Sequence, residues 1–141
     1  MSEVPPVLLS ALVCDRVIFD RMTGMPTLVN VLQVLNTPRF PVRAGQIVFF
    51  CELTNGHGKT ETTIRLVDTA EDEKVVFEKS GTMEFKDVKQ VATLAIALQG
   101  IAFAHPGEYR FQLWAGEQLL GERRIICREV KIPPKENQQI N

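Results

Sequence analysis

Hydrophobic and polar residues alternate along most of this chain, and the alternation is clearest between Glu108 and Trp114. The residues on one side of this stretch are Tyr109, Phe111 and Leu113, and those on the other are Glu108, Arg110 and Gln112. A repeat of two residues is typical of a strand with one buried and one solvated face. A short turn at 115–118 leads into a second apolar run at 119–127, so the two runs predict a β-hairpin.

The same alternation upstream predicts further strands, which the hairpin needs because a lone hairpin is unstable in water. The expected strands, about eight in all, are 8–20, 28–35, 46–53, 60–68, 74–79, 90–98, 108–114 and 119–127. Residues 82–88 fit no pattern clearly, and we expect the strand before them to end at Ser80-Gly81. Residues 90–98 also suit a helix, since Ala and Leu favour one, but their β-branched residues and their place between strand pairs favour a strand.

Turn residues indicate how these strands connect. Gly24 and Pro26 predict a turn that joins the first two strands in a hairpin. Pro38 and Pro41 flank Phe40 in an extended connection that we expect to cross between sheets. The spacing of strands and turns favours an all-β protein, a two-sheet antiparallel β-sandwich. It would form a single domain over 1–132, followed by a polar tail at 133–141.

The composition is that of an ordinary globular protein, with 45% hydrophobic and 23% charged residues among 141. The net charge of -1 and the absence of a basic run argue against nucleic acid and membrane surfaces as partners. The apolar run at 7–14 lacks the positive residues of a signal peptide, so we expect a cytoplasmic protein. Cys14, Cys51 and Cys127 are odd in number and lie in apolar runs, which predicts buried free thiols.

A glycine-rich stretch, Gly56-His57-Gly58-Lys59-Thr60, ends like a phosphate-binding loop. Such a loop needs an earlier glycine, where this chain has Leu53, and it must open a helix whose amides complete the anion site. The residues that follow are rich in β-branched side chains and predict a strand. A hairpin loop between two strands therefore explains the stretch better than a nucleotide site.

Metal and catalytic signals are weak. His57 and His105 are far apart and lack zinc-ligand spacing, so both are expected to be surface loop residues. The acidic residues Asp68, Glu71, Asp72 and Glu73 lack the alternation of a calcium loop and predict a solvated turn. No serine lies in a nucleophile elbow. We therefore expect no metal, no cofactor and no enzymatic activity.

One stretch suggests binding. If Tyr109, Phe111 and Leu113 are buried, Trp114 points outward with Arg110 and Gln112. An exposed Trp beside Arg and Gln is a side chain of the kind that anchors protein contacts. The alternative, that Trp114 covers the end of a sheet beneath a loop, has equal weight.

The turn and alternating aromatic residues at 107–111 resemble the late strand of immunoglobulin-like sandwiches, where a tyrosine ties its hydroxyl to nearby backbone. Over about residues 8–130 the chain also resembles a family of small bacterial β-sandwich proteins of uncharacterised function. The segments that carry this likeness are 14–20, Thr23-Gly24, 28–31, Phe40-Pro41, 107–111 and 119–124. The resemblance implies an immunoglobulin-like fold and no substrate.

The leading interpretation is a non-enzymatic binding module that contacts another protein or forms an oligomer with copies of itself. Arg110, Gln112 and Trp114 are the residues expected at that contact. A site for a small ligand between the loops at one end is an alternative of the same kind. A nucleotide-dependent enzyme built on Gly56 to Thr60 is the interpretation from a different class.

Overall fold

The computed structural model describes residues 4–131 and is all-β. Strands make up 69% of the described residues, which contain no α-helix and one 3-10 turn, η1 (Thr69–Glu71). The strands are β1 (Val7–Phe19), β2 (Pro26–Val31), β3 (Val34–Thr37), β4 (Val42–Arg43), β5 (Gln46–Thr54), β6 (Gly58–Asp68), β7 (Lys74–Phe85), β8 (Ala92–Gln99), β9 (Ala102–Phe103), β10 (Gly107–Ala115) and β11 (Gln118–Glu129).

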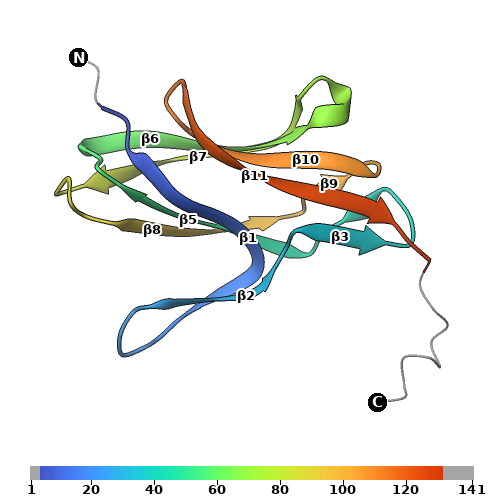
Figure 1. Ribbon diagram of the computed structural model, residues 1–141, viewed down its shortest axis with the longest axis horizontal. Coiled ribbons are helices and arrows are strands. Elements are labelled where there is room, and N and C mark those ends of the chain that lie inside the picture. The colour runs from blue at the N-terminus through green and yellow to red at the C-terminus, as the bar shows by residue number, and fades with distance from the viewer. Residues whose placement is uncertain (1–3, 132–141) are drawn as a thin grey trace.

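These strands form two main sheets. Sheet A has four strands in the order β2-β1-β5-β8, and sheet B has five in the order β3-β11-β10-β6-β7. A small third sheet pairs β4 with β9. The two main sheets lie face to face, and β1 runs obliquely from the level of β11 towards β2 (Figure 1). Neither main sheet curls into a barrel.

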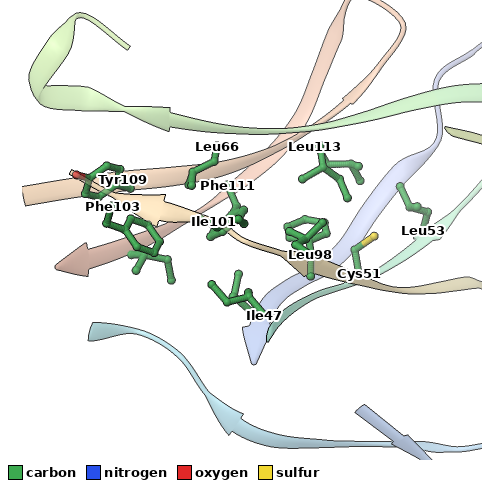
Figure 2. Packing of buried hydrophobic residues seen from close by; sticks show 14 of the residues in the cluster. Ile47, Cys51, Leu53, Leu66, Leu98, Ile101, Phe103, Tyr109, Phe111 and Leu113 are labelled. Atoms are coloured by element: carbon green, nitrogen blue, oxygen red, sulfur yellow. The ribbon is translucent and has the colours of Figure 1, made fainter. Parts of the chain in front are cut away.

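One hydrophobic core fills the space between the sheets. Phe49, Cys51 and Leu53 of β5 belong to the same buried cluster as Phe111 and Leu113 of β10. Each of these five side chains is fully buried, and β5 is also buried on its other face, at Val48 and Phe50. Side chains from both sheets point into this shared space (Figure 2). The predicted inner face of β10, made by Tyr109, Phe111 and Leu113, is confirmed.

Several strand predictions are confirmed, and others are wrong in an informative way. The first hairpin forms as β1 and β2, and the chain crosses between sheets around Pro38 and Pro41. The predicted strand 28–35, however, is divided: β2 stays in sheet A while β3 pairs in parallel with β11 in sheet B. The domain is therefore not purely antiparallel. The described residues form 11 strands and not eight, because the run 28–35 divides into β2 and β3, and the two-residue strands β4 and β9 lacked a sequence pattern.

Two further expectations fail. Ser80-Gly81 does not end a strand, because β7 runs unbroken to Phe85 and pairs with β6 throughout. The stretch before β6 is not a hairpin loop, since β5 pairs with β1 and β8 while β6 pairs with β10 and β7. The chain crosses from one sheet to the other there. The predicted polar tail at 133–141 lies outside the described residues.

Candidate functional site

Arg110, Gln112 and Trp114 lie on the outer face of sheet B, opposite the core residues of β10. β10 is the central strand of this sheet, flanked by β11 and β6. The register places Gln112 beside Glu122 of β11 and Arg65 of β6. We call the surface made by Arg65, Arg110, Gln112, Trp114 and Glu122 the Trp114 face.

A continuous set of polar contacts joins these side chains. The indole Nε1 of Trp114 donates to Oε1 of Gln112 at 3.0 Å, and Nε2 of Gln112 donates to Oε1 of Glu122 at 3.1 Å. The other carboxylate oxygen of Glu122 lies 3.0 Å from Nη1 of Arg110. Nε of Arg110 lies 2.6 Å from Glu108. Every side chain in this series is thereby held in one orientation.

Arg65 covers the ring of Trp114. Its guanidinium carbon lies 4.8 Å from the ring centroid, and its Nε lies 3.5 Å from Oε2 of Glu78. A cation over an aromatic face is attracted by the ring's quadrupole. Trp114 is therefore half-buried, less exposed than the alternation predicted.

The expectation that Gln112 lies on a wet face is wrong, because this side chain is only 6% exposed. It sits among Trp114, Arg65 and Glu122, and these neighbouring side chains shield it from water. Arg65 and Glu122 were not among the predicted site residues. The sequence shows that Arg65 points outward, but its place beside β10 depends on strand register, which no local pattern fixes.

A second apolar surface lies on the β1–β2 hairpin. Ile18 and Phe19 are each 49% exposed, and Met22 and Met25 in the turn are 89% and 66% exposed. The hairpin forms one edge of sheet A, and its turn projects away from sheet B (Figure 1). Clustered apolar side chains in water are typical of contact surfaces. The hairpin is therefore the main competitor of the Trp114 face.

A compact polar cluster closes the end of the domain near η1. Nε2 of His105 lies 2.7 Å from Oδ2 of Asp68 and 3.8 Å from Oε2 of Glu71, while Nδ1 lies 2.7 Å from the carbonyl of Pro106. The hydroxyl of Tyr109 donates to the carbonyl of His105 at 2.7 Å. This tie is the one that the tyrosine at this position predicted.

The neighbours of His105 favour the positively charged form of its ring. Both of its nitrogens face oxygen acceptors, so both hydrogen bonds form only when the ring is doubly protonated. The hydrogen bond to Pro106 raises the pKa of His105, and Asp68 and Glu71 raise it further against the opposing effect of partial burial. His105 and Asp68 therefore form an ion pair within this cluster.

The same three side chains are those that could hold a cation, since their ligand atoms lie within 4.8 Å of one another. Sequence spacing gave no hint of this grouping, because Asp68 and His105 are 37 positions apart. Asp68 is also not the solvated turn residue that was expected. It is 3% exposed, and its Oδ1 accepts from the amide of Ala70 at the start of η1.

The glycine-rich stretch before β6 has structural reasons for its glycines. A methyl group on Gly56 would overlap the ring of Phe85, a core residue, and Gly58 has a φ of 58°. β6 begins at Gly58, so the stretch leads into a strand, as predicted, and not into a helix. His57 is exposed, as expected of a surface loop residue.

A depression of about 420 Å³ lies at the same end as the start of β6. It is lined by the lead into β1, by Lys59, Thr60 and Glu61, and by the turn between β10 and β11. Its volume is within the range of small-molecule sites. The depression offers room for a small ligand between loops at this end of the domain.

The three cysteines are free and buried, as predicted. Burial raises the pKa of the Cys51 and Cys127 thiols to about 12 in each case. Because the thiolate is the reactive form, these two side chains behave as small apolar core residues.

No helix within residues 4–131 has the length and apolar character that a membrane span requires.

The chain matches a family of unknown function, DUF6941, over residues 9–128. It therefore belongs to this family. A comparison with curated proteins finds no significant match.

Proposed function

We propose that the protein is a non-enzymatic, cytoplasmic binding module with an immunoglobulin-like β-sandwich fold, which works by contacting another protein or a copy of itself. The fold assignment is supported by two sheets enclosing one core and by the hydroxyl tie of Tyr109 at the sheet corner. The family match is neutral on function, since the family has none assigned.

The observation that carries the proposal is the Trp114 face. It brings a tryptophan and two arginines together on the central strands of a sheet, and these residue types are enriched among energetically dominant contact residues. Hydrogen bonds already fix their side chains, so less conformational entropy is lost on binding. A partner with a flat, polar-rimmed surface would fit this geometry.

A second candidate function is supported by the end depression. Its lining carries one lysine, Lys59, and two carboxylates, Glu61 and Glu117, around a space large enough for a small polar ligand. Mass spectrometry under native conditions would reveal a retained ligand. A bare protein mass in material purified from the native cell would count against this candidate.

The contact is tested by affinity capture from the native cell with the full-length chain, the Trp114→Ala variant and the Phe19→Ser variant. Loss of a dominant contact residue costs about 2 kcal/mol or more, so Trp114→Ala should lower recovery of a specific partner by at least about tenfold. Phe19→Ser is the matched control, because it also removes an exposed aromatic ring, from the competing hairpin of sheet A.

The two variants distinguish the Trp114 face from the β1–β2 hairpin as the contact surface. Retained capture by Phe19→Ser together with lost capture by Trp114→Ala supports the Trp114 face, whereas the reverse pattern places the contact on the hairpin. Thermal unfolding provides the folding control. If Trp114→Ala costs more than about 3 kcal/mol of stability, the ring is a core residue and the assignment to a contact is wrong.

A further inference from the structure

The two main sheets expose four edge strands, and three of these carry features that block pairing with another chain. β3 is only four residues long. β2 begins at Pro26, and Asn30 within it has a φ of 55°, which bends the strand. β7 is charged, and its Lys79 lies opposite the buried Ile64, so a charge sits on the inner side of the edge. Short length, proline, local distortion and inward charge are all known protections of sheet edges.

The fourth edge, β8, lacks every such feature. Its eight residues, Ala92–Gln99, include no charged residue, no proline and no glycine, and none has a positive φ. Only β5 pairs with it, so the backbone groups on its other side have no partner strand in the described chain. An uncharged, regular edge of this length is a template for addition of another strand.

The side chains of β8 are also incompletely covered at this edge. Leu94 and Ile96 point to the inner side but are only half-buried. Together with Ile64 and Met83 they line a cavity of about 180 Å³ between β8 and β7. An added strand would cover this open side and remove apolar surface from water.

We propose that β8 pairs in antiparallel fashion with β8 of a second copy of this chain. The sequence is self-complementary: a two-fold axis at Ile96 places Leu94 opposite Leu98 of the partner subunit and Ile96 opposite its own copy. On the outer side, Ala95 meets Ala97 of the partner subunit and Thr93 meets Gln99 of the partner subunit. No like charges face each other, and directly opposed apolar pairs stabilise sheets.

This pairing joins two four-stranded sheets into one of eight strands. It is an isologous contact, in which the same surface serves both subunits. Strand pairing of this length buries less than the roughly 1,000 Å² expected of a tight interface, so the dimer should dissociate in the micromolar range. The contact uses a different surface from the Trp114 face, and each can fail without the other.

Sedimentation velocity of the purified full-length chain tests the pairing. The wild-type chain should pass from monomer to dimer between low micromolar and several hundred micromolar concentrations. Ala97 is exposed on the outer side of β8. The Ala97→Lys substitution places two lysines near the two-fold axis, so it should raise the dissociation constant of the dimer by about tenfold or more. Val76→Lys adds the same charge to the β7 edge and should leave association unchanged.

Charge rescue tests the register. Ala95→Glu alone should also dissociate, but a mixture of the Ala95→Glu and Ala97→Lys chains should form a heterodimer, because these positions face each other across the axis. A wild-type chain that stays monomeric throughout overturns the proposal. So does equal weakening by Val76→Lys and Ala97→Lys, or a mixture that stays monomeric.

Discussion

At the scale of single residues, His105 has the most defined role, because each of its ring nitrogens faces an acceptor that needs a proton. The hydrogen bond to the carbonyl of Pro106 raises the pKa of His105 most, and Asp68 and Glu71 raise it further. A group with a raised folded-state pKa contributes stability that is fully present below its unfolded value, 6.5. This contribution is lost as pH rises through the higher folded-state pKa.

His105→Gln should therefore remove a pH-dependent part of the stability. The thermal midpoint of the wild-type chain, measured relative to the variant, should fall as pH rises from below 6.5 through the neutral range. The pKa itself can be read from the ring proton resonances of His105 by NMR, with His57 as the exposed comparison in the same spectrum. A difference in midpoint that does not change with pH would contradict the ion pair.

Gly56 makes a separate prediction at this scale. Gly56→Ala should destabilise the domain by about 1–3 kcal/mol, because the new methyl group overlaps the ring of Phe85 and the core holds that ring in place. Chemical denaturation measures this directly. A neutral substitution would show that the loop before β6 can move away from Phe85.

At the scale of elements, β7 shows that a glycine within a run of strand residues need not end the strand. Gly81 predicts a break, yet the strand passes through it because its pairing with β6 continues on both sides. No atom lies within 4 Å of the position of an added Cβ, and the φ of Gly81 is not in the left-handed region. Gly81 therefore weakens the strand, although no steric constraint requires a glycine at this position.

Gly81→Ala should therefore stabilise the domain by about 0.5–1 kcal/mol, since alanine restricts the unfolded chain and can adopt the native conformation. Its effect is opposite in sign to that of Gly56→Ala, and both are measured by the same denaturation experiment. A loss of stability on Gly81→Ala would mean that the β6–β7 pairing is wrong at this point.

At the scale of the whole molecule, the alternation in the sequence was enough to define the all-β class and the inner face of β10, because burial on one side of a strand is a local pattern. It could not give the order of the strands. The run 28–35 is rich in Val and Leu along its whole length, and pairing with β1 and β11 divides it between two sheets.

The site residues also divide into those that a local pattern predicts and those that depend on how distant segments pair. Trp114, Gln112 and Arg110 could be predicted because they alternate on one strand. Arg65 could not be, since its contact with Trp114 depends on the register between β6 and β10. The Asp68–His105 pair was missed for the same reason, because the end of β6 and the loop before β10 are distant in sequence but meet at one corner.

The central claim, that the Trp114 face contacts a protein, can be tested through Trp114 itself, which is the only tryptophan in the chain. The measurement is its fluorescence, with acrylamide quenching, during titration with a tryptophan-free form of a captured partner. If the partner binds the Trp114 face, the emission should shift to the blue and the quenching should fall as the partner covers the half-exposed ring. Saturable binding that leaves both the emission and the quenching unchanged would contradict it.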